Sequence, residues 1–543
     1  MQRDLDRLTG KTFDLLVVGG GIHGLTIACD GAQRGLAVAL IERGDFGGGA
    51  SFNHLRTIHG GLRYLQTLDI VRARESIRER RALARIAPHA VRVLPFALPL
   101  YRSVLKGKTA MRAAFLLDRA VAFDRNRGVP APHRLPGGVV LSRVGAIERF
   151  PGLRRRGLTG AAVWHDYTTP EADRLTLSWA LAAVEHGAVL ANYVEAVAPL
   201  LSERRAVGVR AIDRRSGREL EVGARVTVNA TAGAFDQSLA RPGDSKPVTL
   251  LRAMNLVTRR EAGDEALGGR SATGRHLFLV PCRNKAIFGT WESARTCAAG
   301  EDTPAEAEVA SFITELNEAF PSLDLEMNDV TLVHRGAVPA AVGRNGIVSL
   351  ETREQIRDHA AGSEPVEGLV SVAGTKYTTA RAVAERATNG VLAKLQRQEV
   401  PCRTAVTALP GGDLLDILST IADARREHDA GLPSDTIPHL IAAYGSRYER
   451  VLDLAGDRSE WRARVGDDSP VIGAQLAWAV RHEMAITLGD AVIRRTPLGA
   501  MGYPGDPAAE RAAGIVGGEL GWSQERKRKE IEMLRQFYVL STS

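Results

Sequence analysis

The stretch VGGGIHG, at residues 18–24, constrains the fold more than any other part of the chain. It follows the apolar run Phe13–Val18 and precedes residues with helical apolar spacing, and Gly19, Gly21 and Gly24 match the pattern GxGxxG. In such a turn the first glycine permits a tight bend, the second lets a pyrophosphate approach, and the third lets helix and strand pack closely. We therefore predict a strand–turn–helix unit that binds a dinucleotide.

Glu42 supports this interpretation because it closes a second apolar run, AVALIE, at the place where an acid binds a ribose hydroxyl. A carboxylate there would repel the 2′-phosphate of NADP, so FAD and NAD remain. Two later segments favour FAD. VTVNATAGAF (Val226–Phe235) looks like the strand and turn that return the chain to the dinucleotide in large flavoproteins, and LVSVAGTKYTTARAVAERA looks like the late glycine turn and helix beneath the flavin.

Length and charge limit the function classes. The chain has 543 residues, 44% of them hydrophobic, a net charge of +8 and a pI of about 9.4. This is enough for about three domains, and the positive charge favours anionic partners. No zinc pattern or aromatic–basic motif supports nucleic-acid binding. The N-terminus is too polar for a signal peptide, and no apolar run reaches the ~18 residues of a membrane span.

The four cysteines have no CxxC spacing, so we expect neither a disulfide framework nor a metal site. A reducing cytoplasm fits this usage. The sequence predicts a cytoplasmic protein, with a peripheral position on the inner face of the cell membrane as an extension of that prediction. Monomer and homodimer both stay open.

The pattern of elements predicts an α/β fold in three parts. A Rossmann-like FAD-binding domain would be discontinuous, formed by residues 12–95, 160–240 and 345–400. A mixed-sheet substrate or cap domain would be interleaved with it, at residues 96–159 and 241–344. The stretch TALPGGD reads as a linker, after which residues 405–543 would form an α-helical domain.

Over most of its length the sequence resembles the FAD-dependent, respiratory glycerol-3-phosphate dehydrogenases. The matching segments include DLLVVGGGIHG, IHGGLRYL, AGTKYTTARAVAERA, LPGGD, AAYGSRYERVLDLAG and RHEMAITLGDAVIRRTPLG. The resemblance implies oxidation of sn-glycerol 3-phosphate at C2 to dihydroxyacetone phosphate, with a proton lost and hydride passed to flavin N5. Electrons would then pass to quinone at a membrane surface, or to another acceptor.

The resemblance also implies roles for individual residues. A guanidinium fork suits a phosphate because it can bond in a bidentate way, and a lysine near the flavin's polar edge would stabilise the reduced anion. The expected catalytic residues are His59, Arg63 and Lys376, and the expected substrate-binding residues are Arg63, Tyr64, Arg335 and Lys376. The expected FAD-binding residues are Gly19, Gly21, Gly24, Glu42, Arg43, Ser51, His59, Gly60, Val194, Thr231, Gly233, Gly374, Lys376 and Thr378.

The sequence departs from the family pattern in the substrate region. Arg56 replaces a lysine before IHGG, Val338 stands where the family has a phosphate-binding arginine, and Trp291-Glu292 replaces a Thr-Asp pair. Arg335 is the expected substitute for that arginine. Asn255 replaces a histidine that is a candidate base, and an asparagine cannot act as a base near neutral pH.

These departures leave the base and the substrate open. His59, Glu292 and His334 are the candidate bases. One alternative function is a diverged FAD oxidase or dehydrogenase that acts on another polyol phosphate, a hydroxy acid or an amine. Another is a flavin-binding protein without turnover.

The segment Lys106–Phe123 mixes apolar and cationic residues at helical spacing. Such a helix can lie on an anionic bilayer surface. The alternative is a packed helix with a solvated basic face.

Overall fold

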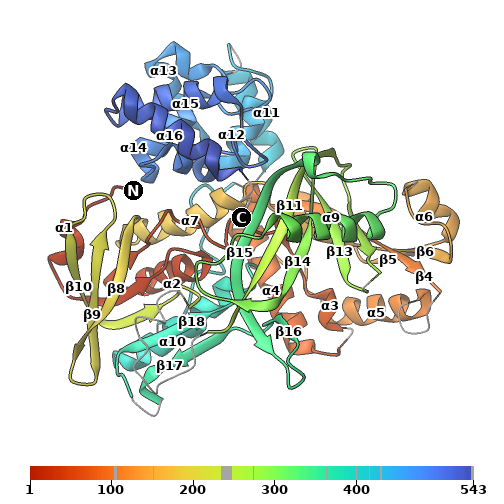
Figure 1. Cartoon of the computed structure of the whole chain (residues 1–543), viewed down its shortest axis with the longest axis horizontal. Helices are drawn as coiled ribbons and strands as arrows, with labels where there is room; N and C mark the ends of the chain where they lie inside the picture. The colour runs from red at the N-terminus through yellow and green to blue at the C-terminus, as the bar shows by residue number, and fades with distance from the viewer. Residues whose placement is uncertain are drawn as a thin grey trace.

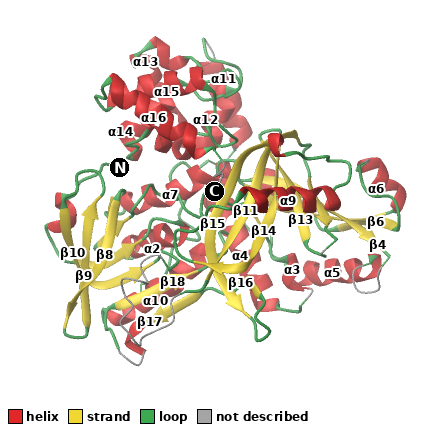
Figure 2. Ribbon diagram, viewed as in Figure 1, coloured by secondary structure: helices red, strands yellow, loops and turns green. Residues whose placement is uncertain are grey.

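The computed structural model places two large sheets side by side below a group of C-terminal helices (Figure 1, Figure 2). It describes residues 1–65, 67–102, 107–150, 152–233, 248–272, 274–361, 365–398, 400–414, 416–428 and 431–539.

The first sheet is the predicted dinucleotide-binding sheet. Its central strand β1 (Phe13–Val18) pairs in parallel with β2 on one side and β10 on the other. All six residues of β1 are buried, as expected for a parallel strand covered on both faces. The strand order is β17 (Gln355–Asp358), β18 (Leu369–Ala373), β10 (Glu219–Asn229), β1, β2 (Val38–Ile41) and β7 (Val189–Ala191), and β8 (Val194–Ser202) and β9 (Arg205–Asp213) extend β10.

Three helices from distant parts of the chain cover this sheet. The helix α2 (Ile22–Gln33) begins at the glycine turn and packs against α7 (Ala172–Glu185) and α10 (Ala380–Lys394). Trp179 of α7 is among the largest fully buried side chains of this core. The sheet and its covering helices therefore combine segments that are far apart in the chain.

The second sheet is mixed and lies beside the first. Its strand order is β16 (Val348–Leu350), β15 (Val330–Val342), β11 (Leu250–Glu261), β14 (Lys285–Cys297), β13 (His276–Cys282), β12 (Ala266–Arg270), β4 (Arg92–Tyr101), β6 (Leu158–Thr168) and β3 (Thr57–Ile58), with β5 (Val139–Leu141) paired to β6. Its strands come from both sides of the expected boundaries at residues 95 and 160, and those boundaries stay a prediction.

Helices flank this sheet at its rim and on one face. Among the residues described before position 400, the other α-helices are α1 (Asp6–Thr9), which packs on β10 of the first sheet, α3 (Leu62–Leu65), α4 (Ile70–Ile86), α5 (Lys108–Val121), α6 (Arg143–Arg149) and α9 (Glu306–Ala319). Met111 and Phe115 of α5 are buried against Leu100 and Ala162 of the sheet. The apolar side of α5 is thus largely core, and Lys106 of the predicted amphipathic segment lies outside the described residues.

The chain beyond residue 416 is helical, as predicted, and forms a core of its own around Trp461. Its helices are α11 (Ile417–His428), α12 (Thr436–Tyr444), α13 (Tyr448–Asp457), α14 (Gly473–Glu483), the π-helical turn Asp490–Arg495, α15 (Asp506–Glu519) and α16 (Gln524–Phe537). Figure 1 shows this group resting on the side of the molecule where α7 lies. The α/β fold with a C-terminal helical domain is confirmed.

Within the described residues, no helix has both the length and the apolarity needed to cross a membrane.

A buried histidine at the base of the helical domain makes stability depend on pH. Burial lowers the pKa of His439 from 6.5 to about 4, although Glu171 opposes the shift. Below pH 6.5 the unfolded chain binds a proton that the folded chain does not, so stability falls as the pH falls toward 4.

We expect His439→Asn to weaken this acid sensitivity by about 1.4 kcal/mol per pH unit. Melting temperatures of both proteins at several pH values between 7 and 5 would check it. Parallel pH profiles for variant and wild type would contradict the assignment.

Candidate active site

A cavity of about 1030 Å³ lies between the two sheets. Its walls include Val18, Ile41, Ala230 and Gly374, which stand at or just after the carboxyl ends of β1, β2, β10 and β18. This edge is where open α/β sheets bind their ligands. The second sheet closes the other side with residues such as Trp164.

The glycine turn forms a cradle that side chains would fill. Gly19 has a φ of +107°, and a Cβ there would lie 2.9 Å from the carbonyl carbon of Ala230. A Cβ on Gly24 would lie 1.8 Å from the carbonyl oxygen of Gly19, so only glycine lets α2 approach β1. The Ile22 N–H, at the start of α2, donates to Ser51 Oγ at 2.9 Å. The cradle and the adjoining cavity fit a dinucleotide.

Glu42 stands beside this cradle. Its carboxylate accepts hydrogen bonds from the N–H of Gly20 at 2.6 Å and the N–H of Gly44 at 2.8 Å. Burial raises the pKa of Glu42, while these two N–H groups lower it. The side chain lines the cavity at the place that the sequence predicts for a ribose-binding acid.

His59 reaches the cavity because of a strand register. Thr57 and Ile58 of β3 pair with Thr168 and Tyr167 of the antiparallel strand β6. The next two residues that face each other in this register are His59 and Asp166. His59 Nδ1 lies 3.1 Å from Asp166 Oδ2, and Nε2 lies 2.9 Å from Thr57 Oγ1. Because a carboxylate accepts the Nδ1 proton, Nε2 is the unprotonated nitrogen of the ring and accepts from the Thr57 hydroxyl, which also lines the cavity.

Asp166 is buried and is held by donors from several elements. Its carboxylate accepts from the Gly60 N–H at 2.8 Å, from Trp164 Nε1 at 3.3 Å and from Arg80 Nη1. Burial raises the pKa of Asp166, but Arg80 and His59 outweigh it and hold the pKa below its usual value. Asp166 is therefore a carboxylate placed to stabilise a positive charge on His59.

Gly60 is needed for this arrangement and does not itself form part of the described cavity wall. A Cβ on Gly60 would lie 2.1 Å from Arg80 Nη1, so a side chain would displace the guanidinium from Asp166.

A group of cations surrounds Tyr64, another residue of the cavity wall. Lys376 Nζ lies 4.6 Å from the centre of the Tyr64 ring, and the guanidinium carbons of Arg63 and Arg72 lie 5.9 and 5.7 Å from it. Arg63, Tyr64 and Lys376 all line the cavity. Two cations on one wall suit a phosphate dianion.

The late glycine turn AGTKYTT contacts both the IHGG segment and the first glycine turn, VGGGIHG. The His59 N–H donates to Thr378 Oγ1 at 3.3 Å, which joins IHGG to the late turn AGTKYTT. A Cβ on Gly374 would lie 2.7 Å from His23 Nε2, so this glycine makes room for a ring from the first turn.

Most of the predicted site residues line the cavity, and four do not. Gly24, Gly60, Gly233 and Arg335 lie outside the described wall. The first two act through packing, and Gly233 follows β10 with a φ of +102°. Those that line it are Gly19, Gly21, Glu42, Arg43, Ser51, His59, Arg63, Tyr64, Val194, Thr231, Gly374, Lys376 and Thr378.

Arg335 and Val338 both lie on β15, and only Val338 belongs to the described cavity wall. Successive side chains of a strand alternate between its faces. Residues three apart therefore point to opposite faces, so Arg335 does not lie where an arginine at 338 would point, and it is not part of the described cavity wall.

The other substituted positions lie behind the wall. Asn255 is buried, accepts a hydrogen bond from Thr290 Oγ1 at 2.8 Å and donates to the Asn53 carbonyl at 3.2 Å. Thr290 is the residue that faces the cavity. Arg56 is buried and donates to Asp173 Oδ2 at 3.2 Å.

Among the three candidate bases, only His59 belongs to the cavity wall that the described residues form. His334 is fully buried against Phe52, and burial lowers its pKa well below 6.5. Glu292 lies on β14, where it is paired with Ala253 of β11.

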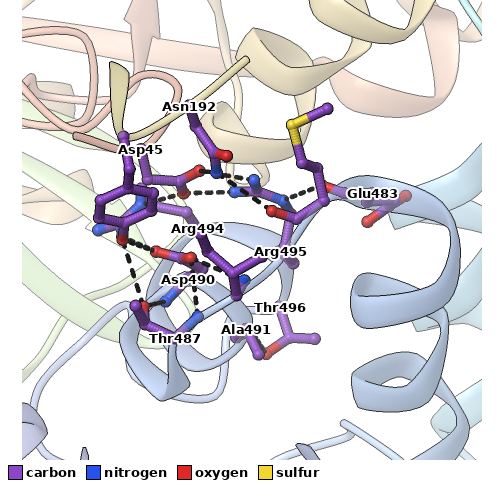
Figure 3. Close-up of polar contacts among 12 residues, drawn as sticks. Asp45, Asn192, Glu483, Thr487, Asp490, Ala491, Arg494, Arg495 and Thr496 are labelled. Atoms are coloured by element: carbon purple, nitrogen blue, oxygen red, sulfur yellow. Dashed lines mark hydrogen bonds and ion pairs between the residues drawn. The ribbon is translucent and has the colours of Figure 1, made fainter. Parts of the chain in front are cut away.

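The C-terminal domain adds residues that sequence reasoning missed. Arg494 lines the cavity together with Asp45 and Tyr193, and Figure 3 shows Arg494 directed at Asp45. The matching motif around Arg494 indicated the family but no contact with the site. Asp166 was missed as well, because a single aspartate in a strand gives no signal of its partner.

The cradle geometry predicts the effect of one methyl group. Gly24→Ala should lower the free energy of unfolding by about 1–3 kcal/mol through overpacking and reduce FAD content. Gly390→Ala on α10 is the matched control because nothing lies within 4 Å of its Cβ position. Flavin absorbance per protein and urea unfolding would check both variants, and an unaltered Gly24→Ala protein would refute the packing argument.

Comparisons with known proteins agree with this geometry. Residues 14–389 match the family model of FAD dependent oxidoreductases, and residues 402–527 match the C-terminal domain of alpha-glycerophosphate oxidase. A glycerol-3-phosphate dehydrogenase of Synechocystis sp. is 30% identical over 98% of each chain. The mitochondrial glycerol-3-phosphate dehydrogenase of Homo sapiens is 31% identical over 97% of this chain and 73% of its own.

The fold is also that of a solved structure. The glycerol-3-phosphate dehydrogenase of Bacillus halodurans, solved in complex with FAD, superposes with a TM-score of 0.75 at 24% identity, covering 99% of this chain and 97% of its own. The chain belongs to the FAD-dependent oxidoreductases and, within them, to the glycerol-3-phosphate dehydrogenases.

Proposed function

We propose that this chain oxidises the C2 hydroxyl of sn-glycerol 3-phosphate and releases dihydroxyacetone phosphate. The observation that carries the proposal is a single cavity in which His59, paired with Asp166, shares a wall with Arg63 and Lys376. FAD, held by the two glycine turns and Glu42, supplies the hydride acceptor.

Arg63 and Lys376 bind the phosphate in this proposal. Both face Tyr64, whose ring gives each cation an apolar and electron-rich neighbour. With Val338 in the wall and Arg335 outside it, these two cations take over the charge that the family's arginine supplies.

His59 removes the proton of the C2 hydroxyl at Nε2. The proton released from the alcohol makes an imidazolium, and Asp166 stabilises this charge through Nδ1–H. Arg80 helps to hold the pKa of Asp166 below its usual value and so favours the ionised carboxylate beside His59.

We also consider a second function, because Val338 makes one part of the cavity wall apolar. A diverged dehydrogenase or oxidase of a hydroxy acid or an amine would need fewer cations there, and one of another polyol phosphate would still use Arg63 and Lys376.

We also propose a cytoplasmic enzyme that passes electrons to quinone at a membrane surface. Leu116 and Phe123, at α5 and just after it, are 70% and 80% exposed, and Arg112 and Arg119 of α5 are exposed as well. Val71, 81% exposed, lies at the start of α4, which packs on α5. Exposed apolar side chains among arginines suit an anionic bilayer.

Anaerobic reduction tests the substrate. We expect sn-glycerol 3-phosphate to bleach the oxidised flavin band of the purified protein, since cations and base share one cavity. A flavin that dithionite reduces but glycerol 3-phosphate does not would favour the second function.

Arg63→Lys should raise the KM for glycerol 3-phosphate by about 10-fold or more because an ammonium loses the bidentate fork. The matched variant Arg335→Ala removes a nearby arginine outside the cavity wall and should change KM by less than about twofold. Steady-state kinetics of both variants would check this, and a larger effect at 335 would reverse the assignment.

Leu116→Glu with Phe123→Glu should weaken binding to vesicles of anionic phospholipid by about 10-fold or more, since two apolar side chains leave the bilayer. Leu418→Glu is the control, because Leu418 is 68% exposed on α11 of the helical domain. Vesicle co-sedimentation measures both, and equal binding of variant and wild type would locate any membrane contact elsewhere.

A further inference from the structure

A buried ion cluster joins the C-terminal helices to the loop after β2. The Asp45 carboxylate, 0% exposed, accepts from Arg494 Nε at 2.6 Å and from Arg495 Nη1 and Nη2 at 2.6 and 2.7 Å. Asn192 Nδ2 adds a fourth donor at 3.0 Å. Figure 3 shows both arginines directed at this one carboxylate.

A second carboxylate completes the cluster. Asp490 accepts from Tyr193 Oη at 2.7 Å and from Arg494 Nη2 at 2.6 Å. It also accepts from the N–H groups of Ile486 and Thr487, both at 3.0 Å. Two aspartates and two arginines thus balance in charge, which buried ions require.

The cluster is built into the wall of the FAD cavity. Asp45, Tyr193 and Arg494 line that cavity, and Arg495 does not belong to its described wall. The backbone around Glu42 is held by the same turn, because the Tyr193 N–H donates to the Gly44 carbonyl and the Val194 N–H to the Glu42 carbonyl, each at 2.8 Å. The C-terminal helices therefore contact the loop after β2 and the turn at residues 192–194. These two segments lie beside Glu42, the predicted ribose-binding acid.

We propose that this cluster couples FAD binding to docking of the C-terminal helices. The arginines of the π-helical turn hold the 42–45 loop and the 192–194 turn in the shape that accepts FAD. Coupling between two binding events is reciprocal, so bound FAD strengthens the docking by the factor that docking strengthens FAD binding.

Arg495→Lys tests the proposal without removing a residue of the cavity wall. It keeps the charge and loses the two-bond fork on Asp45. The matched control is Arg447→Lys, which keeps the charge but loses the two-bond fork of Arg447 on Glu185 of α7, a contact of the same C-terminal helices that does not involve the Asp45 cluster.

The measurement is FAD affinity of the deflavinated full chain, by fluorescence titration, with melting temperatures of both forms. We expect Arg495→Lys to raise the Kd for FAD by about 10-fold. Arg447→Lys should lower the melting temperature of the apoprotein while its Kd for FAD stays within about twofold of wild type. A Kd for FAD in Arg495→Lys equal to that of wild type would overturn the proposed coupling. An equal rise in this Kd in both variants would overturn it as well.

Hydrogen exchange of the wild type provides a test that needs no variant. Amides of the π-helical turn Asp490–Arg495 should exchange about 10-fold more slowly with FAD bound than without it. Identical exchange in the two forms would overturn the proposal even where Arg495→Lys fails to fold.

Discussion

The buried carboxylate of Asp166 is the group on which the site depends. It is the common acceptor for His59 from the chain after β3, Arg80 from α4, Trp164 from its own strand and the N–H of Gly60. Removing one partner of a buried charge pair leaves the other uncompensated, at a cost of about 3–5 kcal/mol. One side chain thus fixes α4 against the second sheet and directs an imidazole into the cavity.

The rest of the site follows from how two sheets meet. The carboxyl ends of the parallel strands supply the glycine cradle and Glu42, and the second sheet supplies Asp166. The two cations proposed to bind substrate, Arg63 and Lys376, lie on α3 and on the turn after β18. Arg494 of the helical domain also lines the cavity, so all three parts of the chain contribute residues to it.

Local signals in the sequence were sufficient to locate the glycine turn and Glu42, which lie at the cavity. Gly19, Gly24 and Glu42 can be recognised in the sequence because each meets a requirement of the backbone or of the ligand within about 30 residues of chain. Asp166 and Arg494 could not be found in this way, because their partners are 107 and 449 residues away in the chain.

Arg335 was assigned by nearness in sequence, which fails on a strand where faces alternate. The predicted amphipathic segment shows a similar limit. Helical spacing located α5, but it could not tell that Met111 and Phe115 pack on the second sheet while Leu116 faces solvent.

The most direct test of the account is the rate of flavin reduction by sn-glycerol 3-phosphate in stopped flow, comparing wild type with Asp166→Asn. The account predicts a variant that retains its flavin spectrum but is reduced about 100-fold more slowly, because His59 loses the carboxylate that stabilises its positive charge. Equal reduction rates in the two proteins would contradict the role given to the His59–Asp166 pair.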